Sequence, residues 1–187
     1  MSTEPLGGYR FERPAEDIMI AKVGNSRVVI RVAGLLLGVE LPAGDALAQT
    51  AKDLVGTWRV ASVTSEQGGT EVTPFGSDPK GILIFDENGR YALILLRPDL
   101  PTFGSNNRTA GTPEENSAVV QGSIAHFGTY AVEGGDTLLL RVEASTFPNW
   151  TGAEQNRPFT LTEGKLEYTV PEAAGGGTAQ VIWTRAD

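Results

Sequence analysis

Stretches in which hydrophobic and polar residues alternate recur from residue 56 to residue 185. Such alternation places successive side chains on opposite faces of an extended chain, so each stretch predicts a β-strand with one buried face. Short strands separated by turn signals are typical of a β-sandwich or a β-barrel. The predicted strands are 56–65, 81–85, 91–96, 127–132, 137–144, 158–161, 166–170 and 178–185, with 70–73 as a short ninth.

Three tight turns join consecutive members of this series. The segments 86–89, 133–136 and 162–165 each contain glycine and an acidic residue and lie between two predicted strands. Asn88-Gly89 is the strongest of these signals, because both residues tolerate the positive φ that two-residue hairpin turns require. Each of the three turns therefore predicts an antiparallel hairpin.

One segment carries the signature of a helix. Thr112 and Glu115 form a capping-box pattern, and Pro113 occupies the first helical position, where its missing N–H costs nothing. We expect this helix to run to about Ala125, either as a packing element or as a lid. The strand 91–96 is apolar on both faces, so its outer face needs a cover. The helix is the first candidate for that cover, and a second copy of the chain is the other.

Residues 1–48 are predicted to be a leader. Lys22, Arg27 and Arg31 precede a short apolar run, and a small-x-small pattern ends at Ala48. This order is typical of a secretory signal peptide, with cleavage after Ala48 and a mature domain of residues 49–187. Met19 is an alternative start, and the alternative to a signal is that 28–39 form a core strand. An exported domain without cysteine suits the periplasm or the outside of a bacterium.

Composition narrows the range of partners. A length of 187 residues suits one domain, and the net charge of −8 argues against binding to nucleic acid or to an anionic membrane surface. The absence of cysteine and the single histidine exclude thiolate and histidine-rich metal sites. No apolar run reaches the roughly 20 residues that span a bilayer. We therefore expect no metal, no cofactor and no membrane span, and a monomer or homodimer.

A series of short motifs points to a family. They are 54–59 (LVGTWR), 74–76 (PFG), 78–83 (DPKGIL), 88–90 (NGR), 97–99 (RPD), 111–115 (GTPEE), 127–130 (FGTY) and 148–157 (PNWTGAEQNR). In this order they resemble the lipocalin-like domain family of the calycin group. The resemblance implies an all-β fold, an antiparallel up-and-down barrel of about eight strands with one short helix and an internal cavity. It implies little about ligand or activity.

The resemblance also implies the role of some positions. Trp58 would plug the base of the barrel, and Arg185 or the neighbouring Trp183 would pack over it, a cation–π contact worth about 0.5–2 kcal/mol. Two positions depart from the family pattern. Arg141 stands where related sequences tend to carry histidine, and Ile94 stands where they tend to be polar. Any chemistry shared at those positions would be altered in this chain.

Several polar and aromatic residues are candidates for ligand binding. Arg141 and Glu143 share one face of a predicted strand and would orient a polar head group if that face were the lumen. Simple patterning makes the opposite, apolar face the inward one, whereas the family pattern favours the reverse. The remaining candidates are Trp150 in a predicted loop, its neighbours Asn149, Gln155 and Arg157, and Tyr130 on the predicted strand 127–132.

Three functions are compatible with these residues. The first is the binding of a small, apolar or amphipathic molecule in the barrel. The second is a cofactor-free enzyme of the isomerase, cyclase or hydrolase type, with Glu143 or His126 as acid and base, which requires the two to converge on one cavity. The third is a protein-interaction module that uses the long loop 97–111, with an exposed apolar rim around Leu100, Pro101 and Phe103.

Overall fold

The structure, a computed structural model, describes residues 20–23, 26–29 and 49–186. The chain divides into two compact units, residues 1–45 and 46–187. In the first unit, β1 (Ile20–Val23) and β2 (Ser26–Val29) pair as antiparallel strands. The rest of the predicted leader, with its cleavage position after Ala48 and the alternative start at Met19, lies outside the described residues.

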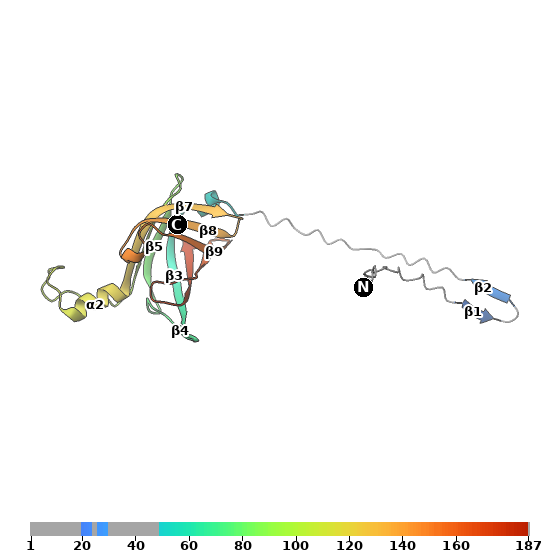
Figure 1. Ribbon diagram of the computed structural model, residues 1–187, viewed down its shortest axis with the longest axis horizontal. Helices are drawn as coiled ribbons and strands as arrows, with labels where there is room; N and C mark the ends of the chain where they lie inside the picture. Colours follow the sequence, from blue (N-terminus) through green and yellow to red (C-terminus); the bar gives the residue numbers. More distant parts are fainter. Residues whose placement is uncertain (1–19, 24–25, 30–48, 187) are drawn as a thin grey trace, which may run out of the picture. The chain divides into compact units, whose positions relative to one another are not determined.

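The second unit is a closed antiparallel barrel of eight strands (Figure 1). Each strand pairs with the next one along the chain, and the last pairs with the first, which closes the barrel without free edges. The predicted up-and-down barrel is therefore confirmed. Its strands are β3 (Gly56–Gln67), β5 (Lys80–Phe85), β6 (Arg90–Leu96), β7 (Ser123–Glu133), β8 (Thr137–Ser145), β9 (Glu154–Thr162), β10 (Lys165–Val170) and β11 (Thr178–Arg185).

The long strand β3 makes the closure possible. Its first four residues pair with β5, and its positions from Trp58 to Glu66 pair with β11. A register shift between Ile182 and Trp183 interrupts the second pairing, and such a bulge increases the local bend of a strand. The end of β3 forms a hairpin with the short extra strand β4 (Thr70–Val72).

Alternation along the strands determines which residues form the core. On β6, for example, Tyr91, Leu93 and Leu95 are buried, while the residues between them face outward. On β8 the apolar face is inside, as its patterning predicts. The largest fully buried side chains are Trp58, Trp183, Arg157, Tyr168, Phe85, Leu54, Leu83, Leu138, Leu140 and Leu166.

Three helical segments complete the second unit: α1 (Ala51–Leu54), α2 (Pro113–Gly122) and the 3₁₀ turn η1 (Pro148–Trp150). The capping box of α2 is present as predicted. The Thr112 hydroxyl accepts from the Glu115 N–H at 3.2 Å, and the Glu115 carboxylate accepts from the Thr112 N–H at 2.8 Å. The helix ends before the predicted Ala125, because Ser123 already pairs with Leu96 as the first residue of β7.

The prediction that this helix covers the outer face of β6 is wrong. Helix α2 leads directly into β7 and projects beyond the sheet (Figure 1). Four large apolar side chains on the outer faces of β5, β6 and β7 stay 36–46% exposed within the described part of the chain. They are Ile82, Ile84, Ile94 and Phe127. None of the helices in the described residues has the length and apolarity needed to span a membrane.

Candidate functional site

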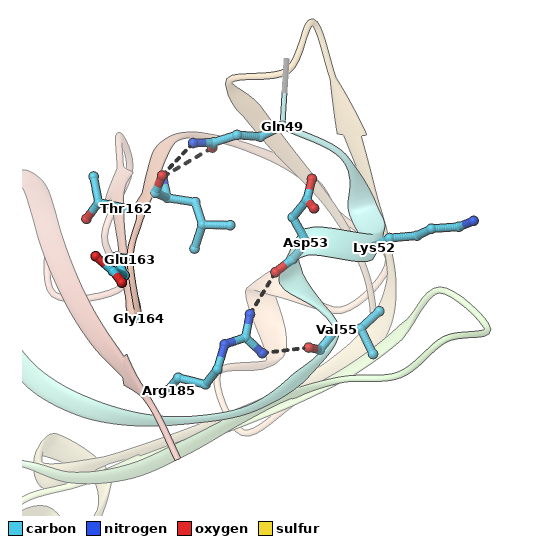
Figure 2. Close-up of a pocket in the computed structure, with 9 residues that line it drawn as sticks. Gln49, Lys52, Asp53, Val55, Thr162, Glu163, Gly164 and Arg185 are labelled. Carbon is cyan, nitrogen blue, oxygen red and sulfur yellow. Dashed lines mark hydrogen bonds between the residues drawn. The ribbon is translucent and has the colours of Figure 1, made fainter. Parts of the chain in front are cut away.

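One end of the barrel is closed by Trp58 and Arg185. The Trp58 ring is fully buried, its Nε1 donates to the Leu54 carbonyl at 2.9 Å, and the Arg185 guanidinium lies 4.3 Å from the ring centroid. The two terminal nitrogens of Arg185 donate to the carbonyl oxygens of Val55 and Asp53, each at 2.8 Å (Figure 2). Each of these contacts joins the segment before β3 to the barrel, so this end is a structural plug.

A hollow of about 550 Å³ lies beside this plug (Figure 2). Gln49 spans one side of it, with its amide donating to the Leu161 carbonyl at 2.7 Å and accepting from the Leu161 N–H at 3.1 Å. The side-chain amide thereby pairs with the backbone of β9 as a strand would. Because the Gln49 and Arg185 side chains are already bonded to the backbone, this hollow is a weak candidate for a ligand site.

The opposite end holds a cavity of about 630 Å³. Its lining combines inward residues of β3, β6, β7, β9, β10 and β11 with the end of α2 and the loop that carries η1. No aspartate or glutamate lines it among the described residues. Its walls are mostly apolar, with contributions from Val63, Phe75, Leu93, Leu95, Ile124, Phe147, Trp150, Val170, Ala179 and Val181.

Arg157 is the charged residue of this cavity. Pairing of β9 with β8 sets Arg157 opposite Leu138 and Gln155 opposite Leu140, so both polar side chains point inward from β9. The Arg157 side chain is 2% exposed and donates through Nη2 to Gln155 Oε1 at 2.6 Å. Its Nε is buried and has no hydrogen-bond partner among the described residues.

Aromatic rings flank the Arg157 guanidinium. It lies 5.0 Å from the ring centroid of Tyr168 and 5.9 Å from that of Trp150, within the range of cation–π attraction. Tyr168 is buried, and burial raises the pKa of its hydroxyl. Sequence reasoning did not single out Tyr168, although its inward position follows from the alternation of the strand 166–170.

His126 borders the same cavity from β7. Its Nδ1 lies 2.9 Å from the Tyr91 hydroxyl, and its ring meets Trp150 edge-on at 5.5 Å between centroids. Burial, and then the charge of Arg157, lower the pKa of His126 to about 3. Burial also raises the pKa of Tyr91. At neutral pH both groups are therefore uncharged, and the histidine is a poor general base.

Trp150 reaches the cavity from η1, packed edge-on against Phe147 at 5.7 Å and against His126. Its neighbour Asn149 is exposed and does not line the cavity. Tyr130 also lies away from the cavity. Its hydroxyl donates to the Asp86 carbonyl at 2.9 Å, and its ring packs on Phe85 at 4.6 Å. Trp150 therefore lines the cavity, whereas Asn149 and Tyr130 do not.

Arg141 and Glu143 lie on the outer face of β8. Arg141 pairs with Glu154 at 2.6 Å, and Glu143 receives two hydrogen bonds from Arg90 at 3.0 and 2.8 Å. The bonds from Arg90 lower the pKa of Glu143. Because the sheet separates Glu143 from the buried His126, the two do not converge on one cavity, and neither Arg141 nor Glu143 can contact a molecule inside the barrel.

The loop 97–111 folds back on the helix that follows it. A Cβ on Gly122 would come within 2.7 Å of the Leu100 side chain, and a Cβ on Gly111 would overlap the Phe103 ring. The two apolar side chains therefore pack at the two ends of α2, and both are half-buried. Of the expected apolar rim, Leu100 and Phe103 are used for packing within the chain, and Pro101 is exposed.

Comparisons with known proteins connect this architecture to a family. Among solved structures, a redesigned β-barrel is 13% identical, with 75% of this chain and 98% of that chain covered and a TM-score of 0.41. The wild-type fluorescent protein UnaG is 15% identical, with 73% and 99% covered and a TM-score of 0.35. No curated protein matches the chain. Residues 55–186 match the family model of the lipocalin-like domain, and the chain belongs to that family.

Proposed function

We propose that this protein binds a small, largely apolar molecule in the cavity of its barrel. The observation that carries the proposal is the cavity of about 630 Å³, with apolar walls and a plug at the other end of the barrel. Apolar pockets with a few convergent polar groups are the usual form of small-molecule sites. Burial of ligand surface supplies about 25 cal/mol per Å², from which the cost of association is subtracted.

The alternatives have less support. An acid–base enzyme would need groups that titrate near neutral pH, whereas burial lowers the pKa of His126 and raises that of its neighbour Tyr91. Glu143 lies across the sheet from both. A protein-interaction module would need exposed apolar side chains on the loop 97–111, and Leu100 and Phe103 pack against the ends of α2. Among the three functions, ligand binding therefore has the most support.

We also propose that the protein is exported to the periplasm or secreted, with the leader removed after Ala48. The basic residues, apolar run and small-x-small pattern before Gln49 support this. Expression of the full chain in a bacterium, followed by fractionation and intact-mass measurement, tests it. A mass equal to residues 49–187 in the exported fraction is expected, and the uncleaved chain in the cytoplasm would contradict it.

A blocked cavity tests the binding proposal. Ala179 is buried in the cavity wall on β11, and Ala179→Phe would fill part of the cavity with a ring. Ala92→Phe adds the same ring on the exposed outer face of β6 and is the matched control. Titration with the neutral fluorophore 1-aminoanthracene should show saturable binding to the wild type and to Ala92→Phe, lost in Ala179→Phe.

Two results would overturn the proposal. Absence of saturable binding to the folded wild type would remove its basis. Equal binding to Ala179→Phe and the wild type, with both variants folded by circular dichroism, would place the probe outside the barrel. Mass spectrometry of organic extracts from the purified protein provides a second measurement, since a retained ligand should be depleted in Ala179→Phe alone.

A further inference from the structure

The cavity contains a buried cation without a counter-charge among the described residues. Arg157 is 2% exposed, it takes part in none of the five ion pairs, and no carboxylate lines the cavity. A buried charge is costly unless an opposite charge and hydrogen bonds compensate it. A guanidinium does not escape this cost by losing its proton. The cavity by itself thus leaves Arg157 in an unfavourable environment.

The neighbours of Arg157 compensate that cost only in part. Gln155 accepts one hydrogen bond at 2.6 Å, and the Tyr168 and Trp150 rings supply cation–π attraction. The buried Nε still has no acceptor among the described residues. These contacts hold the guanidinium in place in the cavity wall, while its charge has no counter-charge among the described residues. A guanidinium that is held in place at a cavity can make a charge-assisted contact with a planar anion.

We propose that the cavity selects apolar molecules that end in a carboxylate, and that this carboxylate pairs with Arg157. The inference rests on the proposed binding function and specifies its ligand class. The carboxylate would supply the missing counter-charge, while the apolar body would occupy the space between β3, β6 and β11. His126 contributes no second charge, because burial keeps it neutral at physiological pH.

A structural role and a ligand-binding role for Arg157 predict different effects of its replacement on stability. If the guanidinium were needed for folding, its replacement by an apolar side chain of similar length would lower the melting temperature of the ligand-free protein. If it is held for a ligand, Arg157→Met removes an uncompensated buried charge, and the melting temperature should stay equal or rise. Arg157→Lys keeps the charge and loses the planar fork, so it separates charge from geometry.

Matched probes measure the preference for a carboxylate. Calorimetric titration at pH 8 compares decanoate with 1-decanol and decylamine, and biphenyl-4-carboxylate with biphenyl-4-methanol as a second, aromatic body. The wild type should bind at least one carboxylate tighter than its alcohol, on the order of 10- to 100-fold, the value of a hydrogen-bonded charge. Decylamine should bind weakest. Arg157→Met should abolish the preference and leave alcohol binding unchanged, with Arg157→Lys intermediate.

The outcomes separate this inference from the binding proposal. Equal affinity of the wild type for the acid and the alcohol would overturn the carboxylate inference and support binding in general. Failure of every probe to bind folded wild type would overturn both. A carboxylate preference that survives in Arg157→Met, together with a lowered melting temperature, would assign Arg157 a structural role. If Arg157→Met fails to fold, the wild-type comparison and Arg157→Lys decide the question.

Discussion

Each end of the barrel holds an arginine against aromatic side chains, but the two arginines differ in their hydrogen bonds. At the base, Arg185 lies over Trp58, and its two terminal nitrogens bond to backbone carbonyls. At the cavity, Arg157 lies between Tyr168 and Trp150, and its Nε has no partner among the described residues. The bonds from Arg185 to backbone carbonyls stabilise the fold. Arg157 lines the cavity and has no counter-charge among the described residues, so its charge is not compensated within the chain as that of a paired arginine would be.

The largest expected effect is at the base. Trp58→Ala removes a fully buried ring together with its bond to Leu54 and its contact with Arg185, and should lower the free energy of unfolding by about 3–5 kcal/mol. Urea denaturation followed by circular dichroism measures the change. A loss below about 1 kcal/mol would show that the plug is not needed to hold the base.

Acid should act on the cavity end. The pKa of His126 is about 3 in the folded state, against an ordinary value of 6.5, so the unfolded chain binds the extra proton between these values and stability falls as pH drops below about 6.5. Between pH 7.5 and 4.5 the loss should be roughly 2–3 kcal/mol. The lowered pKa values of Asp53, Asp86, Asp99, Glu115 and Glu143 add their effect at lower pH.

A matched variant isolates the histidine. His126→Gln keeps a side chain that can donate to or accept from the Tyr91 hydroxyl, and it does not titrate in this window. Urea denaturation at pH 7.5 and 4.5 should therefore show a much smaller difference for His126→Gln than for the wild type. The same pH dependence in both proteins would contradict the assignment to His126.

Substitution of Arg185 tests whether the two ends of the barrel act independently. Arg185→Met loses two bonds to backbone carbonyls and the contact with Trp58, and should lower stability by about 2 kcal/mol. Binding at the opposite end should keep its affinity and its preference for the head group. Thermal melts and probe titration on the same sample test both statements, and a changed ligand preference would break the separation between the two ends.

The smallest stability effect is expected at Trp150, which is half-buried in η1. Trp150→Ala should lower stability by about 1 kcal/mol, the scale of its edge-on aromatic contacts, while it weakens probe binding. Trp150→Phe should recover most of the binding. Unchanged affinity in Trp150→Ala would show that this ring packs on the protein and does not contact the ligand.

Most of the fold could be predicted because its signals are local. The inward face of β8 follows from the apolar series Leu138, Leu140 and Val142, and the capping box at Thr112 and Glu115 marks the start of α2. The position of α2 could not be predicted, since the sequence does not show that β7 starts at Ser123 and leads the helix past the sheet. The prediction that α2 covers the outer face of β6 was wrong for the same reason.

The site was predicted in part. Arg157, Trp150 and His126 do line one cavity, and Gln155 bonds to Arg157. Four other candidates lie elsewhere: Asn149, Tyr130, Arg141 and Glu143. The sequence could not exclude them, because a short pattern does not distinguish a cavity wall from a plug or from an outer ion pair.

The sequence alone determined the alternation, the turns and the capping box, because each depends on residues close together in the chain. The tertiary structure decided which side chains share a space. Pairing of β11 with β3 closes the barrel, and β7, β9, β10 and η1 then bring His126, Arg157, Tyr168 and Trp150 together. That convergence depends on strand register and on closure between the two ends of the domain, which local patterns do not encode.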